Sequence, residues 1–244
     1  MDGSSLLSRF SQLERRGEKV SASPEPAIQE EMWNRLRGLL GKGPGEPKGP
    51  EVPRIEGFPL AGIGASFQLD VGHPRIKECF PDAAELQIVV AVGLIEVDER
   101  YKLIRYYTDD EGFLQAHVDG PLRLENVELL TLWFTESVKS VSSEEDWQRL
   151  LSEEVVLPEV ELWGDRFKPA WEDTSGRPIA FREAYYTEEE RREIDHFMML
   201  YRDVADEEHL LLRSADEIWR AGLCERLFYV HRGIHLGWSL WTAN

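Results

Sequence analysis

The chain has 244 residues, 42% of them hydrophobic, and a formal net charge of −18 at neutral pH. A chain of this length can form one domain with a sizeable core. Acidic and basic residues balance over residues 1–53, so residues 54–244 carry the whole net charge. Such an acidic surface repels a phosphate backbone, which excludes nucleic acid as an expected partner. It suits a cationic partner, although acidity of this kind also serves solubility alone.

The two cysteines, Cys79 and Cys224, lie far apart and form no CxxC or metal-binding spacing. This usage is typical of a reducing compartment, where disulfides are rare. The sequence has no apolar run approaching the ~18 residues of a membrane-spanning helix, and its first residues lack a signal-peptide pattern. We therefore expect a cytoplasmic protein without a transmembrane segment.

The first predicted element is an amphipathic helix over residues 27–40, followed by Gly41 at the position of a helix C-cap. Residues 41–53 combine proline and glycine so densely that neither a helix nor a strand can continue, which predicts a linker. The sequence therefore divides into an N-terminal segment, residues 1–53, and one domain over residues 54–244. The tethered helix either folds back onto its own domain or docks on a partner or a membrane surface, and its mixed acidic and basic polar face favours a protein over anionic lipid. The candidate partner-binding residues are those of its apolar face: Ile28, Met32, Trp33, Leu36, Leu39 and Leu40.

Residues 88–118 are predicted to form three successive antiparallel strands, around which we expect the domain to be organised. Apolar side chains occupy both alternating faces of residues 88–97, which predicts a strand buried on both sides at the centre of a sheet. A short polar connection leads to a second strand over residues 101–107. Gly112 then permits the turn into a third strand over residues 113–118.

The next segments are predicted to add short strands and one helix. Residues 127–135 are apolar on both faces, which predicts a buried strand. Ser143 has the position of an N-cap for a short helix that buries Trp147. Gly164-Asp165 predicts the two-residue turn of a β-hairpin. The strands beside that turn, and the one after them, are expected at residues 160–163, 166–171 and 179–186.

Two further helices are predicted near the C-terminus. Thr187 and Glu190 form a capping-box pattern, which predicts a helix over residues 188–195. Ser214 is interpreted as the N-cap of another helix that ends near Gly222. Strands are expected at residues 196–202, 210–212 and 227–241, with a continued helix as the alternative for 196–202. The predicted fold is α+β: a predominantly antiparallel β-sheet meander with a few short helices.

Two acidic loops are candidate sites for a cation or a cationic ligand. Each joins two predicted strands, and the two would form an anionic pocket for a polyamine or a basic peptide if they converged in space. Acidic residues in a turn are also commonly just solvated. The candidate residues are Asp109, Asp110 and Glu111 in one loop, and Asp203, Asp206 and Glu207 in the other.

The sequence offers no cofactor motif and no metal motif. Gly62-Ile63-Gly64 lacks the third glycine of a dinucleotide-binding fingerprint, so no cofactor is expected. His231 and His235 lie on a predicted strand, where their Cα atoms would be roughly 13 Å apart, too far for both rings to bind one zinc ion. No metal is therefore expected.

An enzyme is not excluded, because a site assembled only by folding leaves no local motif. A carboxylate-based hydrolase would need an acidic residue beside a histidine. The candidate pairs are Asp109 or Asp110 with His117 or His196.

Several short segments occur together: RYYTDD at residues 105–110, FLQ at 113–115, VSS at 141–143 with Trp147, and HFMMLYR at 196–202. In combination they resemble the YjfK-like family of uncharacterised bacterial proteins, from about Leu60 to the C-terminus. The resemblance brings no catalytic residues. It implies neighbouring genes for a phage-shock-type membrane-remodelling protein, a small membrane protein and a glutathionylspermidine-synthase-like enzyme.

We therefore interpret the protein as a non-enzymatic cytosolic binding or adaptor module in a bacterial envelope-stress assembly. The resemblance implies a phage-shock-type, membrane-associated protein as its partner, which would hold it at the periphery of the inner membrane. The alternative is an enzyme or binding protein for a cationic small molecule such as a polyamine, which the net charge and the acidic loops favour.

Overall fold

The computed structural model describes residues 50–171, 176–220 and 222–244. The predicted helix over residues 27–40 and most of the predicted linker lie outside the described residues. The fold below is that of the predicted domain.

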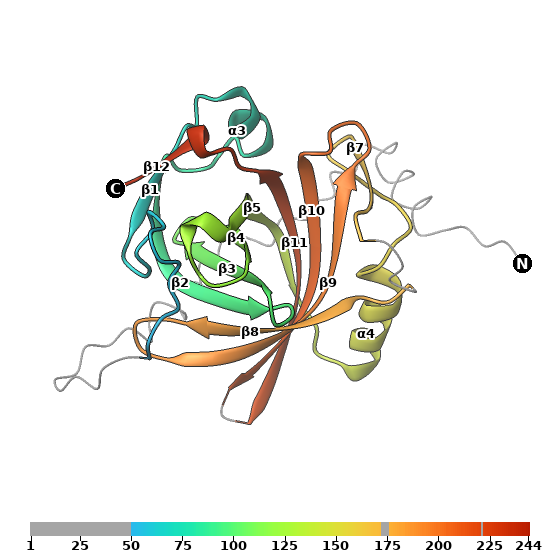
Figure 1. Ribbon diagram of the computed structural model, residues 1–244. Helices are drawn as coiled ribbons and strands as arrows, with labels where there is room; N and C mark the ends of the chain where they lie inside the picture. Colours follow the sequence, from blue (N-terminus) through green and yellow to red (C-terminus); the bar gives the residue numbers. More distant parts are fainter. Residues whose placement is uncertain (1–49, 172–175, 221) are drawn as a thin grey trace, which may run out of the picture. The chain divides into compact units, whose positions relative to one another are not determined.

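Eight strands close an antiparallel barrel in the described part of the chain (Figure 1). Their order around the barrel is β2-β3-β4-β5-β11-β10-β9-β8, and β8 pairs again with β2. The strands are β2 (Leu86–Glu96), β3 (Tyr101–Thr108), β4 (Gly112–Asp119), β5 (Val127–Ser140), β8 (Ile179–Tyr186), β9 (Arg191–Asp203), β10 (His209–Arg220) and β11 (Leu223–His235).

Short elements are attached to the outside of the barrel. β1 and β12 extend the sheet beyond β2, and β7 and β6 extend it beyond β9. α4 begins after Ser143, whose hydroxyl accepts a hydrogen bond from the backbone N–H of Asp146, so the predicted N-cap is confirmed. The bounds are β1 (Ser66–Leu69), β6 (Val160–Leu162), β7 (Asp165–Pro169), β12 (Trp241–Ala243), α3 (Pro74–Cys79), α4 (Glu144–Arg149), the 3₁₀ helices η1 (Leu124–Asn126) and η3 (Trp238–Leu240), and the π-helical turn η2 (Leu150–Glu154).

The antiparallel meander predicted for residues 88–118 is confirmed as β2, β3 and β4. The prediction that the first strand is buried on both faces is wrong for its first half. Val89 is buried, but Ile88 and Val90 are each 39% exposed. The reason is that Val89 packs with Ile76 of α3 in one core cluster, while the opposite face of the strand is left open.

The two helices predicted over residues 188–195 and 214–222 are wrong, since residues 191–195 belong to β9 and residues 214–220 belong to β10. The Thr187 hydroxyl accepts hydrogen bonds from the backbone N–H groups of Glu189 and Glu190, which closes the β8–β9 turn instead of starting a helix. Both capping signals are short-range patterns, whereas burial in the barrel is set by alternation along the whole strand. The strand predicted over residues 196–202 is confirmed.

Two predicted boundaries shift. The β6–β7 turn is formed by Trp163 and Gly164, with φ of 56° and 92°, so it lies one residue before the predicted Gly164-Asp165. Two successive residues with positive φ are typical of a type I′ hairpin turn. The strand predicted over residues 227–241 ends at His235, and η3 and β12 follow it.

The outer surface of the barrel packs against two covering layers. Phe67 of β1, Ile76 of α3 and Trp241 of β12 share one core cluster with the barrel residues Tyr106 and Leu114. A second cluster lies where α4 and the β6–β7 hairpin cover β9, β10 and β11. Its buried side chains include Trp147, Leu150, Phe167, Tyr201 and Phe228.

Large side chains also fill the inside of the barrel. Phe113, Trp133 and Met198 are buried there in a third cluster. Gly233, the cross-strand neighbour of Trp133, makes room for the indole, because a Cβ atom at Gly233 would lie 2.3 Å from a ring carbon. A small residue on β11 therefore allows a large one on β5.

Replacing Gly233 with alanine is expected to destabilise the protein by roughly 1–3 kcal/mol, the usual range for an overpacked core. Gly237→Ala is the matched control, because its added Cβ would meet no heavy atom closer than 3.9 Å. Urea denaturation of the full chain measures the difference. Equal unfolding midpoints for the two variants would contradict this account of the interior.

Candidate functional site

Four charged side chains among the described residues form one cluster inside the barrel, at positions where apolar residues are the norm. They are Arg105 on β3, Glu183 on β8, His196 on β9 and Asp216 on β10. None of these side chains is more than 10% exposed. We call these four residues the interior charge network.

His196 joins the two acidic residues of this network. Its Nε2 lies 2.6 Å from Glu183 Oε2, and its Nδ1 lies 2.8 Å from Asp216 Oδ1. Because an ionised carboxylate only accepts hydrogen bonds, both ring nitrogens must donate, and the imidazole is protonated. The Ser214 hydroxyl donates to the same oxygen of Asp216 at 2.5 Å.

The pKa values of the network agree with this geometry. Burial alone would lower the pKa of His196, but the adjacent Asp216 and Glu183 carboxylates raise it to about 9. Burial alone would raise the pKa of both carboxyl groups, yet Arg105 lowers the pKa of Glu183 and His196 lowers that of Asp216. At neutral pH two positive and two negative charges therefore cancel inside the barrel.

Glu183 has three further neighbours. The Tyr107 hydroxyl donates to its carboxylate at 2.8 Å, and Arg105 Nη1 lies 3.5 Å from the same group. Arg105 Nε donates to Gln115 Oε1 at 2.8 Å. Gly93 on β2 leaves the space for this carboxylate, because a Cβ atom there would lie 1.5 Å from Glu183 Oε1.

Neutral polar groups continue the network along the barrel. Gln115 Nε2 lies 2.9 Å from His117 Nε2, and the Tyr101 hydroxyl lies 3.1 Å from His117 Nδ1. Burial lowers the pKa of His117 to about 4, so its ring is neutral at physiological pH. The Trp133 indole N–H donates to the Thr131 hydroxyl at 2.8 Å. These polar groups are hydrogen-bonded to one another within the barrel.

His231 and His235 both belong to β11, as the predicted strand requires. His231 Nδ1 lies 3.2 Å from the Thr135 hydroxyl, and its ring stacks on Tyr229. Burial lowers the pKa of His231 to about 3 and also lowers that of His235. His231 is therefore a neutral part of the barrel interior.

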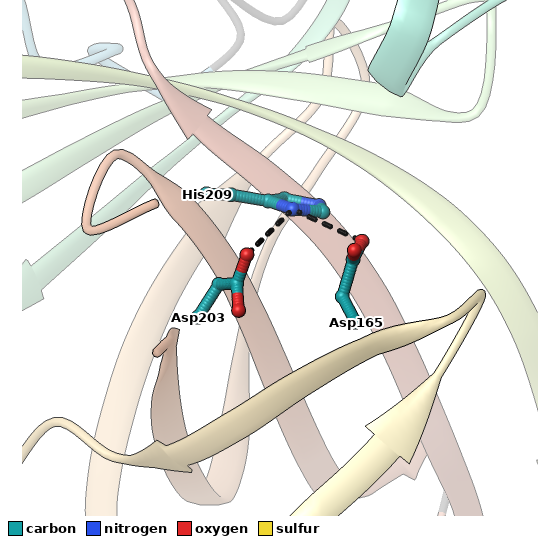
Figure 2. Close-up of side chains that lie close together, drawn as sticks. All are labelled: Asp165, Asp203 and His209. Atoms are coloured by element: carbon teal, nitrogen blue, oxygen red, sulfur yellow. Dashed lines mark ion pairs between the residues drawn. The ribbon is translucent and has the colours of Figure 1, made fainter. Parts of the chain in front are cut away.

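A second cluster, Asp165, Asp203 and His209, lies where β7, β9 and β10 meet (Figure 2). One ligand atom from each residue lies within 4.8 Å of the others. His209 Nδ1 is 3.4 Å from Asp165 Oδ2 and 3.9 Å from Asp203 Oδ2. Asp203 belongs to the predicted cation-binding residues, whereas Asp165 and His209 were not predicted. We call these three residues the Asp–Asp–His cluster.

Arg232 of β11 borders this cluster. Its Nε donates to His209 Nε2 at 2.8 Å, and its Nη2 lies 3.7 Å from Asp165 Oδ2. The guanidinium also lies over the Trp163 ring. Burial and Arg232 lower the pKa of His209, so its ring is neutral at physiological pH.

The two predicted acidic loops lie at opposite ends of the barrel. β9 is five antiparallel steps from β3 around the barrel, so the two strands run in opposite directions. The β3–β4 turn follows the end of β3, and the β9–β10 turn follows the end of β9. The two loops therefore do not form the single anionic pocket that their convergence would have given.

Acidic side chains in both loops are already engaged within the chain. Asp109 accepts from the backbone N–H of Ile88, and Asp110 accepts from that of Ala84. Glu111 adopts a positive φ of 57° in the same turn. In the other loop, Asp206 lies 3.4 Å from Arg75, and Glu207 lies 3.9 Å from Arg202. These contacts give both loops a role in turn structure or charge pairing.

The candidate hydrolase pairs are not brought together by the fold. Asp109 and Asp110 lie in the β3–β4 turn, where they accept hydrogen bonds from Ile88 of β2 and from Ala84 just before it. His117 and His196 point into the barrel, where their hydrogen-bond partners come from other residues. His196 does lie beside two carboxylates, but these are Glu183 and Asp216.

Sequence reasoning missed Glu183 although a signal was available. It alternates with Phe181 and Tyr185 in a strand that was predicted correctly, so it is a charged residue on an otherwise aromatic face. Asp216 had no such signal, because its segment was interpreted as a helix. Asp165 and His209 are linked only by the fold.

Among the residues that the structure describes, none of the helices has the length and apolar character needed to span a membrane. A family model with the description "Protein of unknown function (DUF2491)" matches residues 42–239. No curated protein and no solved structure matches the chain.

We expect His196 to remain protonated up to about pH 9, whereas His231 stays neutral down to about pH 3. Because the pKa of His196 in the folded protein is raised above its ordinary 6.5, its stabilising contribution is complete below that pH. This contribution is lost as the pH rises through about 9, on the order of 3 kcal/mol in all. Histidine NMR titration measures the pKa values, and urea denaturation across the same range measures the stability. A His196 pKa near its ordinary value of 6.5 would contradict the two hydrogen bonds of its ring to Glu183 and Asp216.

Proposed function

Since this chain belongs to the family described as "Protein of unknown function (DUF2491)", its function has to be inferred from its own features, and we propose that it is a non-enzymatic binding or adaptor module. The observation that carries this proposal is a projecting hairpin with exposed apolar side chains on a barrel whose interior charges pair with one another. Binding is then a property of the outer surface.

The β10–β11 hairpin extends past its neighbours at one end of the barrel (Figure 1). β10 pairs with β9 only as far as Ile218, and β11 pairs with β5 only from Leu227. Beyond these points Trp219 is 55% exposed and Leu223 is 76% exposed. Burying two such side chains in an interface would contribute roughly 1.5–3 kcal/mol each, and tryptophan is among the residues enriched at binding hot spots.

The partner class comes from the YjfK-like resemblance, which implies a phage-shock-type, membrane-associated protein in an envelope-stress assembly. Such a partner would hold a cytoplasmic adaptor at the periphery of the inner membrane. The predicted helix over residues 27–40 would supply a second contact surface.

A binding protein or enzyme for a cationic small molecule such as a polyamine is the alternative. The net charge of −18 supports it. The loop geometry supports it less, because Arg75 lies 2.8 Å from Glu208 and 3.4 Å from Asp206. A polyamine would therefore have to displace an arginine at that loop.

Replacing Trp219 and Leu223 together with serine is expected to reduce capture of the partner at least tenfold, because both exposed apolar side chains are lost. Cys224 pairs with Trp219 across the hairpin and is exposed, so a photo-crosslinker attached to it reports contacts at this surface. The matched control replaces Leu124 and Val204, two exposed apolar residues at the other end of the barrel, with serine. Equal crosslinking yields from both double variants would exclude the hairpin as the contact surface.

Removal of residues 1–49 tests the predicted helix separately. The truncation stops there because Val52 and Ile55 pack against the core cluster of α3 and β1. Recovery of the crosslinked partner should fall if the helix binds the partner, with an unchanged midpoint of urea denaturation. Undiminished recovery would leave the hairpin as the contact surface and remove the role of the helix.

A further inference from the structure

The Asp–Asp–His cluster has a chemistry that the adaptor proposal does not use. We propose that Asp165, Asp203 and His209 form a binding site for one divalent transition-metal ion, of the zinc or manganese class. The inference is independent of the proposed function. It rests on burial, on the spacing of the ligand atoms and on the hydrogen bonds of His209.

The fold fixes the three residues in one place. Asp165 begins β7, Asp203 ends β9 and His209 begins β10. β7 pairs with β9 through Phe167 and Asp203, and a short turn joins β9 to β10. Asp203 and His209 are buried, with side chains 6% and 7% exposed, while Asp165 is 34% exposed. Asp165 is therefore the solvent-exposed member of the cluster.

The spacing of the ligand atoms is that of metal ligands. A charge-assisted hydrogen bond would bring a ring nitrogen to about 2.7–2.9 Å from a carboxylate oxygen. The observed distances from His209 Nδ1 are 3.4 Å to Asp165 and 3.9 Å to Asp203. Ligands about 2.0–2.1 Å from a tetrahedral ion stand roughly 3.4 Å apart. The contact to Asp165 already has this spacing, and an ion would draw the Asp203 oxygen closer to complete the set.

His209 directs its Nδ1 at the centre of this cluster. Its Nε2 accepts a hydrogen bond from Arg232 Nε, whereas its Nδ1 makes no hydrogen bond to Asp165 or Asp203 at the distances above. This ring nitrogen therefore lies beside two carboxylate oxygens as a third potential ligand atom. Two carboxylate oxygens and one imidazole nitrogen suit zinc or manganese better than calcium, which prefers six to eight oxygen ligands.

Arg232 sets the condition under which the ion binds. While Arg232 donates to Nε2, the neutral ring of His209 carries its proton on Nδ1, the atom that faces the carboxylates. Metal binding at Nδ1 requires the ring proton of His209 to be on Nε2. The guanidinium of Arg232 only donates hydrogen bonds, so it cannot accept one from this N–H. Arg232 must therefore turn away from His209 when the ion binds. Glutamine at this position would accept from Nε2–H and would remove the positive charge.

Calorimetry of the full, chelator-treated chain with Zn²⁺ and Mn²⁺ tests the site. We expect one ion per chain, at least tenfold weaker binding in Asp203→Asn and in His209→Gln, and tighter binding in Arg232→Gln. Asp206→Asn, in the same loop but outside the cluster, is the matched control and should change the affinity less than twofold. Addition of Zn²⁺ to the unmodified chain should shift the NMR signal of His209 before that of His196, a readout that does not depend on how the variants fold.

Three results would overturn the proposal. The first is no saturable heat with either ion. The second is equal weakening by Asp203→Asn and Asp206→Asn, which would indicate diffuse attraction to an acidic loop. The third is a Zn²⁺ titration that leaves the His209 signal unchanged.

Discussion

The barrel depends on the cancellation of charge around His196. An unpaired carboxylate inside a protein costs several kcal/mol in lost hydration, and this barrel encloses two, Glu183 and Asp216. Protonated His196 binds both, and Arg105 supplies the second positive charge. Each of the four residues comes from a different strand, so the network holds β3, β8, β9 and β10 in one register. Because this interior is buried and neutral, the binding sites that we propose lie on the outer surface and at the junction of β7, β9 and β10.

Much of the fold could be predicted from alternation of apolar residues, and its closure could not. The meander of β2 to β4, the strand β5 and the capped helix α4 follow from patterns within about 15 residues. The pairing of β8 with β2 has no local signal, because it joins segments that are far apart in the sequence. The helices predicted from capping patterns at Thr187 and Ser214 were wrong for the same reason. Their capping patterns extend over four residues, whereas the strands that contain or follow them are stabilised by neighbours on both sides.

The candidate sites were predicted less well than the fold. Asp203 was the predicted acidic residue that the fold brings into a cluster with a histidine and a second carboxylate. Its partners Asp165 and His209 come from different strands, so their spacing in the sequence carries no information. The interior charge network was missed because charged residues in a strand are normally read as its solvent face. In a closed barrel each strand directs one face into the interior, away from solvent, and Glu183 lies on the interior face of β8.

The pairing of β8 with β2 spans four residue pairs, Val92–Ile95 with Glu183–Tyr186, and it completes the cylinder. Hairpins such as β2–β3 and β3–β4 are local and can form early in folding, whereas a contact between such distant segments forms late. Glu183 lies within this pairing, opposite Ile95, so the closure of β8 onto β2 brings its carboxylate, already beside His196 of the β8–β9 hairpin, to Arg105 of β3. Barrel closure and neutralisation of the Glu183 carboxylate are thereby coupled.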